Sequence, residues 1–251
     1  MKNKPFVPAV LLIVLTVGFD GSARAEPPKL GLSLNEKMFT LSAEDRISFF
    51  PPYFSGKATV SPNNGVSVCL HYMAEYLQTE SPSIFTLSPS TDPLKLEVLQ
   101  RDMYNLSRDL HNSSFLILQP SVRFLSDSQS DIWTRLCLTV DSRRNLVQVF
   151  SGLKMSIRKF LPDPYVWSGE PVISFSGFDG HFTDVQVWNC PLSYHEVYKY
   201  MSGSGDRPRK GSVLSWSNIS YSIQGNALLE DTYVWVENWM VGRRGSMCQP
   251  K

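Results

Sequence analysis

The chain has 251 residues, with 24 basic and 23 acidic side chains and a formal net charge of +1. A balance this close to neutral carries no signal for nucleic acid or for an anionic membrane surface, so we expect no nucleic-acid partner. With 17 prolines, 15 glycines and 12% aromatic residues, the composition favours short strands joined by turns over a helical bundle.

The first 25 residues have the three parts of a secretory signal peptide. Lys2 and Lys4 supply a positive start, residues 9–17 form a short apolar run, and residues 23–25 form a small-residue cleavage site. A membrane anchor is the alternative, but it needs roughly 18 to 20 apolar residues and this run is shorter. We therefore expect a secreted, extracellular protein that does not span a membrane, with a mature chain that begins near Glu26.

Short segments rich in β-branched and aromatic residues recur along the rest of the chain. We predict strands at residues 38–41, 46–50, 66–77, 83–87, 94–99, 115–118, 134–141, 146–150, 171–175, 183–187, 220–223 and 232–236. Clusters of proline, glycine, asparagine and serine separate these segments. Short strands at such regular spacing indicate an all-β fold, either a sandwich or a barrel.

One segment, residues 188–203, breaks the strand pattern. Ser193 followed by Glu196 forms a capping box, and Leu192 can pack against Val197 as a hydrophobic staple. Gly203 stands where such a helix would stop. We therefore predict one short helix of roughly two turns, whose aromatic residues pack against the β structure rather than form a ligand site.

Three N-glycosylation sequons begin at Asn105, Asn112 and Asn218. Such triplets also occur by chance, but in an exported chain we expect at least one of them to carry a glycan at the surface. Asn105 and Asn112 belong to a polar stretch, residues 105–113, that we interpret as an exposed loop.

Four cysteines in an exported chain are candidates for disulfides, and without a CxxC pair a structural zinc site is not expected. Cys69 and Cys137 each fall on the more polar side of a strand with period-two alternation. Neighbouring strands of one sheet could bring these two to bridging distance, and two buried free thiols are the alternative. Cys190 and Cys248 could bridge within the chain, which would tie the tail to the start of the helix, or could link subunits.

Catalytic motifs are not found in the sequence. The four histidines, His71, His111, His181 and His195, are scattered, and neither G-x-S-x-G nor H-E-x-x-H occurs. No strand carries the closely spaced carboxylates of a sandwich glycosidase. We expect no catalytic residue and no enzymatic activity.

Residues 180–197 carry a resemblance to a known family. Their pattern, G-x-x-x-x-V-x-V-W-N-x-x-L-S-x-x-E-V, resembles the late strand and helix of pentraxins, the secreted relatives of C-reactive protein and serum amyloid P component. E-K-M-F-T-L at 36–41, V-C-L-H-Y at 68–72, L-C-L-T-V-D-S at 136–142 and W-S-N-I-S-Y-S-I-Q-G-N at 216–226 are similar to other pentraxin strands, in the expected order. Arg135 and Val140 replace the His and Trp of the family's second-cysteine signature, so the chain resembles a divergent member.

The resemblance implies a two-sheet antiparallel jelly-roll sandwich, pentraxin-like or concanavalin-like, with one short helix. This domain would occupy residues 26–240, between a signal peptide at 1–25 and a C-terminal tail at 241–251. The resemblance also implies a disulfide between Cys69 and Cys137, and self-assembly into a flat ring of five subunits. A ring places many weak sites on one face, which strengthens binding to repetitive surfaces.

Calcium is the cofactor that the resemblance implies, and calcium takes six to eight oxygen ligands, several of them from carboxylates. Asp92 matches one family ligand position, but Pro93 replaces the accompanying amide, and the acidic second loop is shortened. Only Asp179 and Asp184 remain near that loop, and neither falls on the family pattern. We interpret Asp92 and Asp179 as turn residues and expect the double calcium site to be largely missing, with Asp92 as the one metal-ligand candidate.

Two functions remain compatible with the sequence. The first is a multimeric, lectin-like recognition protein of innate immunity that binds phosphocholine or polysaccharide on microbial or damaged-cell surfaces. Its partners would be copies of itself together with surface glycans or phospholipid head groups. The second is a calcium-independent structural or matrix glycoprotein on the same fold.

Overall fold

A computed structural model describes residues 27–52, 65–75, 82–87, 93–100, 102–108, 115–126, 132–166, 171–177, 179–203 and 210–233. The predicted signal peptide, the C-terminal tail, Asp92, Asn112 and Cys248 lie outside these ranges. None of the helices within them is long and apolar enough to cross a membrane.

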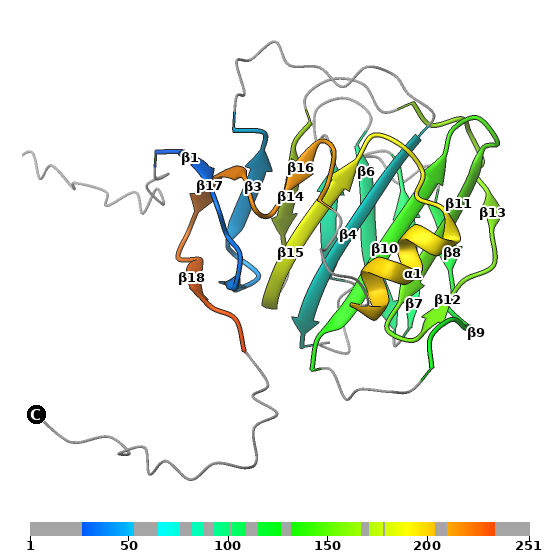
Figure 1. The fold of residues 1–251 in the computed structure, drawn as a ribbon, viewed down its shortest axis with the longest axis horizontal. Helices are drawn as coiled ribbons and strands as arrows, with labels where there is room; N and C mark the ends of the chain where they lie inside the picture. The colour runs from blue at the N-terminus through cyan, green and yellow to red at the C-terminus, as the bar shows by residue number, and fades with distance from the viewer. Residues whose placement is uncertain are drawn as a thin grey trace, which may run out of the picture.

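The chain folds into two antiparallel sheets that pack against each other (Figure 1). The first sheet has eight strands in the order β1-β17-β3-β14-β5-β6-β7-β8. These strands are β1 (Lys29–Leu32), β3 (Arg46–Phe50), β5 (Ser83–Leu87), β6 (Leu94–Gln100), β7 (Met103–Ser107), β8 (Phe115–Leu118), β14 (Ile173–Ser176) and β17 (Ile219–Gln224).

The second sheet has the order β18-β2-β15-β4-β10-β11-β12-β9, while β13 pairs with β11 and β16 pairs with β15. Its strands are β2 (Lys37–Leu41), β4 (Gly65–Ala74), β9 (Val122–Arg123), β10 (Thr134–Asp141), β11 (Leu146–Ser151), β12 (Lys154–Met155), β13 (Lys159–Phe160), β15 (Gly180–Trp188), β16 (Leu214–Ser215) and β18 (Leu228–Asp231). The longest strands, β4, β10 and β15, lie side by side at its centre.

The inner faces of the two sheets share one aromatic-rich core. The ring of Phe39 on β2 lies 5.5 Å from that of Phe49 and 5.0 Å from that of Tyr221, both of which belong to the other sheet. Phe175 and Phe182 stack across the same interface at 4.1 Å. Because alternate residues of a strand point to the same face, period-two hydrophobicity is enough to assemble this core. The predicted two-sheet jelly-roll sandwich is confirmed.

The predicted helix is present as α1 (Tyr194–Ser202), which covers the outer face of the second sheet in front of β10 (Figure 1). Glu196 N donates to the Ser193 side chain, and the Glu196 carboxylate accepts from Ser193 N at 2.7 Å. The helix ends at Gly203, whose φ of 64° suits glycine because it has no Cβ. The capping box and the stop signal are both confirmed.

Replacing Ser193 with alanine is expected to lower the free energy of unfolding by about 1 kcal/mol, because it removes the side-chain acceptor for the first turn of α1. Asparagine also caps helices well, so Ser193→Asn serves as the control and should stay close to the parent protein. Chemical denaturation of the three proteins checks this, and equal losses for both variants would contradict the role of the cap.

Three sequence interpretations are corrected by the structure. Thr232 and Tyr233, the described part of the strand predicted at 232–236, are not in a strand, and residues 234–236 lie outside the described ranges. The strand β18 ends just before them, at Asp231. It was not predicted, and neither were β1, β7 and the two-residue strands β9, β12, β13 and β16. The supposed loop at residues 105–113 begins within β7, because Leu106 faces the core while its polar neighbours pair with the adjacent strands.

Candidate functional site

A disulfide joins Cys69 of β4 to Cys137 of β10, which lie directly opposite each other in the antiparallel pair. The predicted pairing is confirmed, but the polar character expected for this side of the sheet is not. Both cysteines are 0% exposed because α1 covers them with Val197 and Met201. The sheet therefore has two buried faces here, and the disulfide lies under the helix rather than in the main core.

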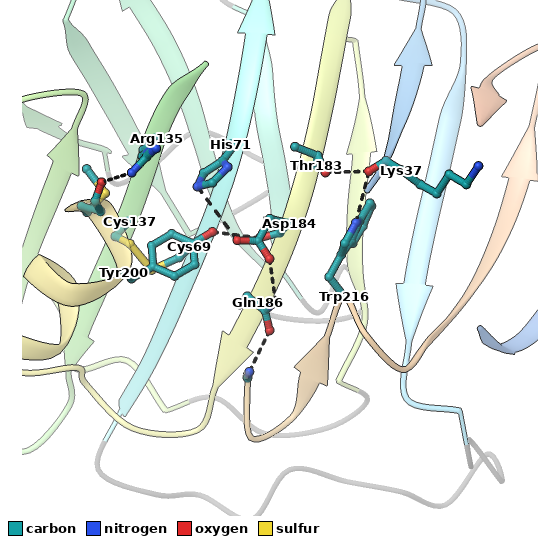
Figure 2. A network of polar contacts seen from close by, with 12 residues as sticks. Lys37, Cys69, His71, Arg135, Cys137, Thr183, Asp184, Gln186, Tyr200 and Trp216 are labelled. Carbon is teal, nitrogen blue, oxygen red and sulfur yellow. Dashed lines mark hydrogen bonds and ion pairs between the residues drawn. A yellow bond between two sulfur atoms is a disulfide. The ribbon is translucent and has the colours of Figure 1, made fainter. Parts of the chain in front are cut away.

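A polar network beside the disulfide connects the helix to β15 (Figure 2). The pairing of β15 with β4 shifts register between Thr183 and Gln186, and Asp184 in this bulge has a φ of 50°. The Asp184 carboxylate accepts a hydrogen bond from the Gln186 amide at 2.7 Å and lies 3.9 Å from His71 Nε2. The bulge thus turns a carboxylate toward a histidine below the helix.

Tyr200 links α1 to this network. Its hydroxyl donates to the Asp184 carbonyl at 2.9 Å. Burial raises the pKa of Tyr200 well above its ordinary value of 10.0, and the charge of Asp184 raises it further. The phenol therefore keeps its proton at neutral pH and acts as a donor. On the other side of the helix, Arg135 donates to the carbonyl of Met201.

The contacts of the network are those of a structural hydrogen-bond network that connects secondary-structure elements. Its bonds reach a backbone carbonyl, an amide and the turn at Gly211, whose N–H donates to the Gln186 side chain at 2.8 Å. Gln186 is 4% exposed, so it has little access to a substrate. The arrangement holds α1, β15 and the turn before β16 in place.

A small hollow of about 320 Å³ lies at the ends of β2, β4 and β15, and Glu75, Asp179 and His181 line it. Asp179 accepts a hydrogen bond from Ala43 N at 2.6 Å with its carboxylate, and one from Glu75 N at 3.2 Å with its carbonyl. Asp179 therefore joins the ends of β2 and β4 to the start of β15 through backbone donors distant in sequence, and its assignment as a turn residue stays a prediction. Among the residues that the structure describes, no group of three or more His, Cys, Asp or Glu side chains could hold a metal ion.

Asp92, the one predicted metal ligand, lies outside the described residues and stays a prediction.

The sequons and the remaining cysteines have different environments. Asn218 is exposed in the turn before β17. Asn105 is 8% exposed, and its amide donates to Glu97 at 2.9 Å, so the surface position expected for it is corrected.

Cys190 is exposed just after β15, and its carbonyl accepts from Ser67 Oγ at 2.9 Å. Its pairing with Cys248 stays a prediction.

Sequence comparison with known proteins finds similarity to pentraxins. The chain is 25% identical over 178 residues to C-reactive protein of Mesocricetus auratus, covering 65% of this chain and 75% of that protein. It is 26% identical over 187 residues to Jeltraxin of Lepidobatrachus laevis, covering 69% and 79%. No protein-family model matches the chain.

Among solved structures, the native heptameric SAP-like pentraxin from Limulus polyphemus superposes with a TM-score of 0.60. The match covers 80% of this chain and 98% of the Limulus chain at 14% sequence identity, so it bears on the fold alone. The fold is a jelly-roll sandwich like that of the Limulus pentraxin. In sequence the chain is similar to pentraxins at 25–26% identity, which fits the divergent resemblance.

Proposed function

We propose that this protein is a secreted, self-assembling recognition protein that binds repeated phosphocholine or polysaccharide ligands on microbial or damaged-cell surfaces. In this role it would serve innate immunity as a lectin-like glycoprotein without enzymatic activity. Support comes from the similarity to C-reactive protein and Jeltraxin. The observation that carries the proposal is the pair of apolar edges at opposite ends of the sandwich, because assembly makes weak ligand sites effective.

The first apolar edge is formed by β1 and β18, which lie at the same end of the two sheets (Figure 1). Leu30 on β1 is 62% exposed, and Leu228 on β18 is 56% exposed. Leu32 and Leu229 extend the same edge, and each is 38% exposed. Four exposed leucines on two edge strands favour contact with another protein surface.

The second apolar edge lies at the other end of the two sheets, where β8 is the last strand of one sheet and β13 pairs with β11 of the other (Figure 1). Phe160 on β13 is 73% exposed and Phe115 on β8 is 62% exposed. The Lys159 side chain donates to the carbonyl of Ile117 at 2.7 Å, which joins this edge across the two sheets. Unlike edges at opposite ends favour a head-to-tail contact, and such a contact forms a ring when the rotation between neighbouring subunits closes. The Limulus relative is heptameric; from the resemblance we expect five subunits here.

Sedimentation of matched lysine variants tests the head-to-tail contact. Leu228→Lys and Phe160→Lys each damage one edge, so each protein alone should sediment as a monomer. A mixture of the two should form a one-to-one dimer, because each variant still offers the edge that the other lacks. Ile132→Lys, at a residue 43% exposed outside both edges, should leave the assembly intact. A mixture that stays monomeric would contradict the head-to-tail contact.

We also propose that ligand binding does not require the double calcium site of the family. The two carboxylates near the shortened loop already have protein partners, since Asp179 accepts from Ala43 N and Asp184 accepts from Gln186. Retention on phosphocholine and polysaccharide resins, with calcium and with chelator, tests this. Equal retention in both conditions is the expected result, and retention abolished by chelator would overturn it.

A structural or matrix glycoprotein is the second candidate, and the same occupied carboxylates favour it. In that case the assembled protein would bind neither resin in either condition. Sedimentation and resin binding measured on one preparation separate the two functions, because a matrix role keeps the assembly and loses only the retention.

A further inference from the structure

A groove of about 450 Å³ lies on the outer face of the second sheet, between the β10–β11 turn and the start of α1. Thr139 and Gln148 of the sheet line it, together with Tyr194 of α1. Three arginines, Arg143, Arg144 and Arg158, also line it. No residue of the polar network around Asp184 lines it, so the groove is a separate feature of the helix-bearing face.

The arginines come from two segments that the sheet brings together. Arg143 and Arg144 belong to the turn between β10 and β11, and Arg158 lies between β12 and β13, both of which pair with β11. All three side chains are exposed at the surface. A guanidinium carries its charge at every physiological pH and offers a planar set of donors. The groove therefore has three permanently charged cationic groups, and the pairing of strands in the sheet brings them together.

Carboxylates in the groove leave these cations only partly neutralised. Asp141 accepts from Arg144 N at 3.1 Å, and its other oxygen lies 3.9 Å from Arg144 Nε. Glu196 is held by the capping box of α1. Arg143 forms no hydrogen bond or ion pair with any residue in the described part of the chain, and Arg158 has only the Gln148 side chain, at 3.4 Å.

The shape and chemistry of the groove favour an acidic sugar over the choline group considered above. Its volume lies within the roughly 300–1,000 Å³ of typical ligand sites. A quaternary ammonium such as choline is held by several aromatic faces, whereas this groove offers Tyr194 alone together with three cations that repel choline. Guanidinium groups instead match sulfate and carboxylate in a bidentate geometry.

We propose that this groove binds an acidic oligosaccharide, one that carries sulfate or carboxylate groups, without calcium. Arg143 and Arg158 contact the acidic groups, while the half-exposed ring of Tyr194 lies against a sugar face. One subunit contains the whole groove, so the site does not depend on self-assembly. The inference rests on the proposed function and deepens it, because it names the polysaccharide class and the place where it binds. Its affinity should fall as salt rises, because exposed charges are screened.

Calorimetry of the full chain in the presence of chelator tests the proposal with tetrasaccharides as probes. A heparin tetrasaccharide carries sulfate, a hyaluronan tetrasaccharide carries carboxylate alone, and maltotetraose is neutral. We expect an acidic probe to bind at least about tenfold more tightly than maltotetraose, a difference of about 1.4 kcal/mol. The tighter of the two acidic probes identifies the acidic group. Equal binding of all three, or acidic binding only with added calcium, overturns the proposal.

Paired arginine variants locate the site. The double variant Arg143→Ala/Arg158→Ala should lower the affinity for the acidic probe at least about tenfold. Arg46→Ala, at an exposed position on the first sheet, should leave the affinity unchanged. Thermal unfolding should be the same for all proteins because the three side chains are exposed. Equal weakening by Arg46→Ala, or none by the double variant, overturns the assignment. Because each probe is too short to join subunits, these outcomes do not depend on the ring.

Discussion

Replacing Cys69 and Cys137 together with alanine lowers the free energy of unfolding by about 4 kcal/mol in the chain-entropy model, because the disulfide closes a long loop in the unfolded chain. The cysteines are 68 residues apart in sequence, and both are 0% exposed beneath α1. Alanine avoids placing a polar group in that apolar layer. Urea denaturation of the double variant and of the parent protein measures the difference.

A second cysteine variant controls for the replacement of a cysteine outside the Cys69–Cys137 disulfide. Cys190→Ser changes an exposed position outside the buried layer, and we expect it to shift the unfolding midpoint little. Adding reductant to the parent protein should reproduce the loss seen in the double variant. If reductant had no effect while the double alanine variant was destabilised, packing rather than the covalent bond would explain the result.

Phe39→Ala should cost about 3–5 kcal/mol, the usual range for removing a fully buried phenylalanine. Phe39 is 0% exposed and has edge-on ring contacts with Phe49, Tyr221 and Trp216, in addition to a stacked contact with Phe182. It therefore connects both sheets at one point. Removing its ring leaves a cavity that a β-sandwich can close only in part. Chemical denaturation measures the loss.

Phe39→Leu provides the matched control, since leucine fills part of the cavity and lacks only the aromatic contacts. We expect its loss to be clearly smaller than that of Phe39→Ala. Equal losses for the two variants would show that ring contacts outweigh cavity formation. A Phe39→Ala loss below about 1 kcal/mol would contradict the central place of this residue, because exposed positions already reach roughly half that value.

The sequence predicted well those structural features that depend on residues close together in the chain, such as helix caps and strand bounds. The capping box of α1 needs only Ser193, Glu196 and the backbone between them, and Gly203 ends the helix through its own backbone freedom. The strands at residues 46–50, 83–87 and 115–118 begin and end where their hydrophobic pattern does. Such patterns report local geometry directly, because side chains alternate along every strand.

Features that depend on distant partners were predicted less well. The polar residues around Asn105 suggested an exposed loop, yet Asn105 lies in β7, which pairs with β6 on one side and with β8 on the other and is buried there. Cys69 was assigned correctly to the opposite side from Val68 and Leu70, but its burial depends on a helix more than 120 residues later in the chain. Composition alone cannot say which polar faces another element will cover.

The sequence by itself determined the alternation of the strands, the limits of the helix, and, through the family resemblance, the partner of each disulfide cysteine. Only the tertiary structure decided which strands stand at the two edges and which charged side chains share a groove. Arg143 and Arg158 meet because β12 and β13 both return to β11, and the start of α1 completes the groove. Which distant residues come together depends on the pairing and register of strands far apart in the chain, and the short-range periodicity of the sequence does not specify these.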